Sequence, residues 1–131
     1  VAYTKSLSIQ PDNALVLNNY AYYLSLRGED LDKAHQMAQK ALELQPDNAS
    51  YLDTFAWILF QQKDFYQALI WIEKAIDKTE EGNGTLLEHY GDILFHLDRA
   101  DEAVQQWQKA AAAGETSALI EKKINDKKYY E

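Results

Sequence analysis

Residues 11–24 read PDNALVLNNYAYYL, and residues 46–59 read PDNASYLDTFAWIL, a near copy placed 35 positions later. Residues 81–94, EGNGTLLEHYGDIL, continue the pattern after the same interval. Each copy carries large or small apolar residues at intervals of 3, 1 and 3: Leu17, Tyr20, Ala21 and Leu24; Leu52, Phe55, Ala56 and Leu59; Leu87, Tyr90, Gly91 and Leu94. These intervals place the side chains on one face of an α-helix, whereas a strand would show alternation.

A second helical set follows each copy: Ala34, Ala38 and Ala41; Ala68, Ile72 and Ala75; Ala103, Trp107 and Ala110. Each unit is therefore expected to be a pair of helices, and small residues at the contact let the two backbones approach closely. Asn13 and Asn48 stand where an N-cap acceptor is needed. The turn before the third unit, Gly82-Asn83-Gly84, lacks the proline of the other two, and we expect a more flexible joint there.

Composition limits the classes of function. The 131 residues suit one domain, and 47 % hydrophobic with 26 % charged residues is a globular composition. The absence of cysteine excludes disulfides, thiolate zinc sites and cysteine nucleophiles. A net charge of −8 disfavours nucleic acid and anionic membranes as partners, and no apolar run has the length of a membrane span.

The repeat resembles the tetratricopeptide repeat family, whose first helix reads large-x2-large-small-x2-large and whose second carries Ala-x3-aromatic-x2-Ala. Leu17-x2-Tyr20-Ala21-x2-Leu24 and Ala103-x3-Trp107-x2-Ala110 match these patterns, whereas Ala38 stands where a large residue is usual. Residues 51–57 and 89–92 look most like bacterial members of the family. The resemblance implies an all-α, right-handed α-solenoid of antiparallel helix pairs.

We expect a single domain over residues 1–131. Its parts are the tail of an incomplete repeat (1–12), three repeats (13–46, 47–82 and 83–114) and a C-terminal capping helix (115–131), with the helix itself at 115–128. A solenoid needs such a cap, with a polar outer face, for solubility. The first residue is Val1, so a fragment of a larger protein is expected.

Enzyme activity is not expected, and neither is a cofactor. No glycine-rich phosphate loop is present, and no nucleophile motif accompanies the three histidines. His89, Asp92 and His96 share a helix face, but seven residues separate the two histidines by about 10 Å along the axis. One metal ion with ligand bonds of about 2 Å cannot reach both, so we expect no metal site.

In the family that this chain resembles, the first helices line a concave groove that binds peptides. The residues that the resemblance places in the groove are Asn18, Tyr22, Asp53, Trp57, Phe60, Glu88, Asp92 and Phe95. This groove is aromatic and acidic. Alternatively, several of its aromatic side chains, Tyr22 and Phe95 above all, pack against the neighbouring repeat. The family's chaperone-tail binders hold a carboxylate with cations that are missing here, so complementarity favours a basic or neutral protein or peptide with an apolar anchor.

The expected function is a protein–protein interaction scaffold or adaptor. One alternative is a structural module that packs on neighbouring repeats of a parent protein or self-associates through its N-terminal edge. The other is regulatory support for an enzyme domain elsewhere in that protein. Tyr66 and Trp71, on the second helix of the middle unit, form a further candidate patch on the outer face. We expect a soluble chain, without membrane insertion, in the cytoplasm or the periplasm.

Overall fold

The computed structural model describes residues 13–79 and 83–130, and within these ranges the chain forms seven α-helices and no strand. The expected tail of an incomplete repeat at 1–12 lies outside the described residues. The helices are α2 (Ala14–Arg27), α3 (Leu31–Leu44), α4 (Ala49–Gln61), α5 (Phe65–Asp77), α6 (Gly84–His96), α7 (Ala100–Ala113) and α8 (Ile120–Asp126). None of these described helices has both the length and the apolar character needed to cross a bilayer.

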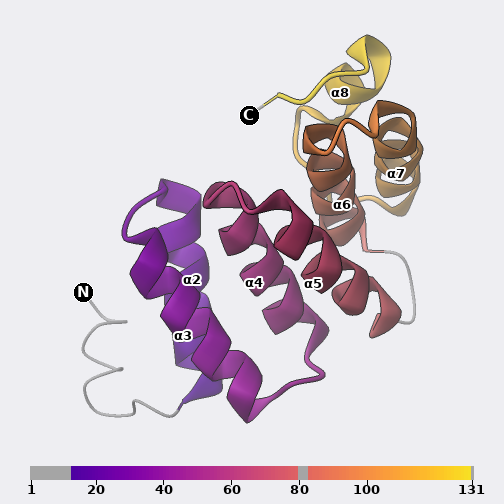
Figure 1. Cartoon of the computed structure of the whole chain (residues 1–131). Helices are drawn as coiled ribbons and strands as arrows, with labels where there is room; N and C mark the ends of the chain where they lie inside the picture. Colours follow the sequence, from indigo (N-terminus) through magenta and orange to yellow (C-terminus); the bar gives the residue numbers. More distant parts are fainter. Residues whose placement is uncertain (1–12, 80–82, 131) are drawn as a thin grey trace.

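The helices form three pairs that follow one another along the chain, α2 with α3, α4 with α5 and α6 with α7 (Figure 1). The two helices of one pair contact each other most extensively. Successive pairs are joined by contacts of α3 with α4 and of α5 with α6. The first helices also contact one another, α2 with α4 and α4 with α6, while α8 packs on α7. The expected all-α solenoid of helix pairs is confirmed.

Asparagine caps the first helix of every pair. The side-chain Oδ1 of Asn13, Asn48 and Asn83 accepts a hydrogen bond from the backbone N–H three residues later, at 3.1, 3.1 and 3.2 Å. This satisfies one of the free donors at each helix start. Asn83 is therefore a helix cap and not a flexible turn residue. A Cβ on the next residue, Gly84, would lie 1.5 Å from the carbonyl oxygen of Gly114, so only glycine fits there.

The close approach within each pair depends on small side chains. Ala21 and Ala56 are fully buried, and so are Ala34, Ala68 and Ala103 on the second helices. In the third pair Gly91 is the residue equivalent to Ala21 and Ala56. A Cβ on Gly91 would lie 2.4 Å from Cδ1 of Trp107. The glycine therefore makes room for the indole. Three of the large residues in the repeated apolar pattern of the first helices are only half-buried: Tyr20, Leu87 and Tyr90.

The C-terminal cap is shorter than expected from the sequence. The helix expected at 115–128 is limited to α8, residues 120–126. Residues 114–119 instead run irregularly along the start of α6, where Thr85 Oγ1 donates to the carbonyl oxygen of Glu115 at 2.8 Å. A left-handed Lys127 (φ 54°) ends α8. Tyr129 beyond it lies against Phe60 of α4, with a ring-centroid distance of 5.8 Å.

Candidate functional site

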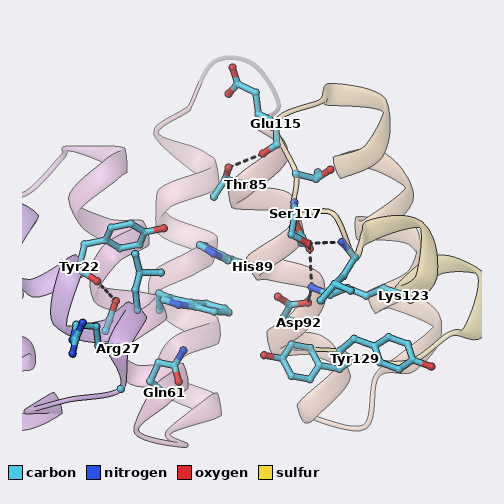
Figure 2. Close-up of a pocket in the computed structure, with 18 residues that line it drawn as sticks. Tyr22, Arg27, Gln61, Thr85, His89, Asp92, Glu115, Ser117, Lys123 and Tyr129 are labelled. Carbon is cyan, nitrogen blue, oxygen red and sulfur yellow. Dashed lines mark hydrogen bonds and ion pairs between the residues drawn. The ribbon is translucent and has the colours of Figure 1, made fainter.

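A cavity of about 580 Å³ lies on the face formed by α2, α4 and α6, and we call it the inner groove. Figure 2 shows Tyr22 and Arg27 on one side, His89 in the middle, and Lys123 and Tyr129 of the C-terminal segment on the other. The first helices of the three pairs thus supply one wall and the floor. The C-terminal segment supplies the opposite wall.

The α2 wall offers apolar and polar contacts to a ligand. Leu26 lines the cavity and is 62 % exposed, so its apolar side chain is accessible to a ligand. Tyr22 is half-buried, and burial together with the charge of Asp53 raises the pKa of its hydroxyl. The hydroxyl therefore stays protonated. Arg27 is already paired, with Nη2 3.0 Å from Glu29 Oε1.

The floor of the groove is a stacked pair of rings from neighbouring repeats. The centroids of Trp57 and His89 lie 4.0 Å apart with planes 17° from parallel. His89 Nδ1 donates to Asp53 Oδ1 at 2.8 Å, which fixes the orientation of the imidazole. Burial lowers the pKa of His89, but the charge and hydrogen bond of Asp53, with the charges of Asp92 and Glu88, together outweigh this effect, and the pKa is raised. The Trp57 ring also stacks on Phe60 of the same helix, at 4.6 Å, so the indole packs both within α4 and against α6.

The far wall is held by one lysine and two carboxylates. Lys123 Nζ lies 2.7 Å from Glu88 Oε2 and 2.9 Å from Asp92 Oδ1, and all three side chains are buried. Ser117 adds two bonds to Glu88, from its backbone N–H (2.7 Å) and from its hydroxyl (2.5 Å). The Trp107 indole N–H donates to Asp92 Oδ1 at 3.0 Å. The acidic pair on α6 is therefore hydrogen-bonded from within the chain, and one ammonium offsets part of its negative charge.

The two carboxylates that share this ammonium titrate differently. Burial raises the pKa of Asp92 to about 6, although Lys123 opposes it. Burial also acts to raise the pKa of Glu88, but hydrogen bonds from Lys123 and Ser117 outweigh it and lower that pKa. Glu88 receives three hydrogen bonds and Asp92 receives two, so Glu88 holds the negative charge more strongly.

Four of the eight expected site residues line the groove: Tyr22, Trp57, Glu88 and Asp92. Asp53 is not part of the groove lining but accepts a hydrogen bond from His89. Phe60 is buried among Trp57, Phe65, His96 and Tyr129. Phe95 packs on Trp107, at 5.9 Å. Asn18 is buried, and its Oδ1 has no hydrogen-bond partner among the described residues. Packing against the next repeat is seen for Trp57, through His89, and for Phe60, through His96. The two residues for which this alternative was chiefly expected differ: Phe95 packs on Trp107 of its own pair, and Tyr22 lines the groove.

Sequence reasoning missed the residues that the C-terminal segment contributes, Ser117, Lys123 and Tyr129. A signal for Lys123 was present, because it shares a helix face with Ile120 and Ile124. Glu88 and Asp92, four residues apart on α6, form a matching acidic pair. The described residues contain no group of three His, Asp or Glu side chains arranged to hold a metal ion.

Comparison with known proteins agrees with this architecture. The profile of the family described as Tetratricopeptide repeat matches residues 2–36. No curated protein matches the sequence significantly. The solved structures described below are less than 25 % identical to this chain, and such likeness concerns the fold alone.

Three of these structures illustrate the likeness. YrrB, described as a TPR protein with an unusual peptide-binding site, gives a TM-score of 0.78 at 24 % identity, over 97 % of this chain and 64 % of its own. The first TPR domain of human RPAP3 gives a TM-score of 0.78 at 19 % identity, and the match covers 89 % of this chain and 91 % of that domain. PilF of Pseudomonas aeruginosa gives a TM-score of 0.72 at 22 % identity, and the match covers 95 % of this chain and 60 % of PilF. The chain thus spans less than two thirds of YrrB and of PilF.

Proposed function

We propose that this chain, whose repeats and fold are those of a tetratricopeptide repeat domain, binds an extended peptide segment of a partner protein in the inner groove. A fold of this kind supports protein–protein interaction. Modules of this fold are generally non-catalytic, and we propose the same for this chain. The observation that carries the proposal is the inner groove itself. It is preformed by packed helices, so a peptide would bind without ordering its receptor.

The charges around the groove favour an uncharged segment with an apolar anchor. Arg27 is paired with Glu29, and Lys123 with Glu88 and Asp92. His89 is paired with Asp53. A charged ligand would have to compete with these contacts, whereas an apolar side chain can pack on Leu26 and Tyr22 without breaking any of them. Between the basic and the neutral partner expected from the sequence, this pairing favours the neutral one.

Known neighbours support peptide binding as a use of the fold. The first TPR domain of Spaghetti (RPAP3) has been solved with the HSP90 peptide SRMEEVD, and it matches this chain with a TM-score of 0.77 at 18 % identity. That peptide ends in acidic residues. Here Arg27, Lys123 and His89, the basic side chains that line the groove, are already paired within the chain, so we expect the peptide SRMEEVD not to bind.

The test is selection from a random peptide library displayed against the purified domain, followed by fluorescence anisotropy on the selected peptides. Tyr22→Ala and Leu26→Ser remove the free contacts of the α2 wall and leave the buried ion pairs intact. Asp53 and Asp92 are unsuitable targets, because their replacement would break contacts that the fold needs.

We expect each of the two variants to raise the Kd by about 10-fold, which corresponds to about 1.4 kcal/mol. The matched control is Tyr66→Ala on α5, which removes a side chain that is 75 % exposed on the outer face. Equal loss in the control, or selected peptides that bind all variants alike, would place binding outside the inner groove. Binding of SRMEEVD at the same affinity would contradict the preference for an uncharged segment.

A further inference from the structure

A second cavity, of about 490 Å³, lies between α3 and α5 and over α4. It shares no lining residue with the inner groove. We call it the outer cavity, and its walls include Leu42, Leu59 and Pro46 as well as the side chains discussed below. It therefore belongs to the face formed by the second helices, where Trp71 stands.

Three aromatic rings form one wall of the outer cavity. His35 and Trp71 each stand edge-to-face with Phe55, at ring-centroid distances of 4.9 and 5.0 Å and interplanar angles of 71° and 78°. In the third pair, the residue at the position of Phe55 is Tyr90, whose hydroxyl reaches Glu73 of α5 at 2.9 Å. Phe55 has no hydroxyl with which to make the corresponding bridge to α3.

Acceptors of hydrogen bonds surround the rings. Glu43 and Asp64 both line the cavity, and Glu43 is exposed. Gln62 donates through Nε2 to Asp32 Oδ1 (3.3 Å), which leaves its Oε1 to accept from His35 Nδ1 (3.0 Å). In the neutral ring, the proton is then on Nδ1, and Nε2 is an acceptor. No lysine or arginine of residues 13–79 or 83–130 lines the cavity.

The indole of Trp71 already attracts a cation. Lys74 Nζ lies 4.2 Å from its ring centroid, although Lys74 is not part of the cavity wall. Aromatic faces next to carboxylates favour a guanidinium over an ammonium, because the planar group stacks on a ring and donates two parallel hydrogen bonds to a carboxylate. A cavity of this size also accommodates the whole apolar stem of an arginine side chain.

We propose that the outer cavity is a second binding site, which takes an arginine side chain presented by a partner protein. The guanidinium stacks on the aromatic wall and pairs with Glu43, while its stem packs on Leu42 and Leu59. This site is independent of the inner groove, so the domain can contact one partner through both faces or two partners at once.

The test is an NMR titration of the isotope-labelled domain with N-acetyl-arginine N-methylamide. N-acetyl-citrulline N-methylamide is the matched probe, because it has the same shape without the charge. We expect saturable shifts of the Trp71 indole N–H with the arginine probe, in the millimolar range, and binding of the citrulline probe weaker by about 10-fold. The corresponding lysine probe should also bind less tightly than arginine.

Two variants locate the site. Glu43→Gln should weaken the arginine probe and leave the citrulline probe unchanged, whereas Glu121→Gln, an exposed carboxylate of α8, should change neither. Equal affinity of the arginine and citrulline probes would show that the cavity takes an uncharged side chain and would overturn the proposal. So would shifts confined to Trp57 in the inner groove, an absence of shifts at Trp71, or tighter binding of the lysine probe. Shifts of Trp71 that follow protein concentration alone would identify a second copy of the chain as the occupant.

Discussion

Lys123 Nζ lies 2.9 Å from Asp92 Oδ1, and the two side chains are only 4 % and 3 % exposed. The contact joins α8 to α6, helices that are otherwise linked mainly through α7. It brings a full positive charge into the protein interior, where an ion is stable only if it is paired and hydrogen-bonded. The C-terminal segment is therefore a structural part of the third repeat as well as a wall of the inner groove.

Lys123→Met tests the role of this ion in stability. The methionine keeps the apolar stem but leaves Glu88 and Asp92 buried without their cation. We expect the free energy of unfolding at neutral pH to fall by about 3 kcal/mol, as for other buried pairs that lose one partner. Urea denaturation followed by circular dichroism measures the change. The control is Lys109→Met on the exposed side of α7, which should stay within about 0.5 kcal/mol of the parent. A similar small effect at Lys123 would show that Glu88 and Asp92 do not need the ammonium.

The raised pKa of Asp92 predicts that its carboxyl group makes a pH-dependent contribution to the stability of the fold. Its pKa is about 6 in the folded chain, against an ordinary value of 3.8. The folded state thus holds this proton more tightly than the unfolded state does. The protonated carboxyl of Asp92 therefore makes its full contribution to stability below about pH 3.8, and this contribution is lost as the pH rises through 6.

Asp92→Asn isolates this contribution, because the amide keeps an oxygen for the Trp107 indole but does not titrate. We expect the stability of the parent, relative to this variant, to fall by up to about 3 kcal/mol between pH 4 and pH 7, at about 1.4 kcal/mol per pKa unit. Glu88 and His89 titrate in both proteins, but both interact electrostatically with Asp92, so the difference reports Asp92 together with its effect on these neighbours. Parallel stability curves for the two proteins would contradict the assigned pKa.

Much of the fold could be predicted from the sequence, because the same helical spacing occurs three times and each copy checks the others. The half of the expected site residues that line the inner groove, such as Tyr22 and Trp57, follows from the same helix-face reasoning. The burial of Lys123 could not be predicted in this way. Lysine is usually exposed, and its position depends on how α8 docks. The helix expected at 115–128 was too long, because Ser117 bonds to Glu88 instead of continuing a helix.

Gly91→Ala should destabilise the domain although alanine is the better helix former. Alanine gains about 1 kcal/mol in helix propensity, but its Cβ would lie 2.4 Å from Cδ1 of Trp107 and 3.0 Å from the carbonyl oxygen of Ala103. We expect a net loss of about 1–3 kcal/mol from overpacking. A double-mutant cycle with Trp107→Leu measures the cause, since the smaller leucine should remove at least about 1 kcal/mol of this penalty. Additive effects of the two substitutions would show that the indole does not set the requirement for glycine.

The turns within the three pairs predict a stabilising substitution. Gly28, Lys63 and Asp98 occupy the same position, 35 residues apart, and all are left-handed, with φ of 65°, 67° and 62°. A side chain in this region costs about 1 kcal/mol, which glycine avoids. Lys63→Gly should therefore raise the free energy of unfolding by about 1 kcal/mol, and Gly28→Ala should lower it by a similar amount. The control is Lys109→Gly within α7, where glycine should instead cost about 1 kcal/mol. Urea denaturation of the three variants decides the matter, because a loss of stability in Lys63→Gly equal to that in Lys109→Gly would mean that the left-handed turn carries no strain.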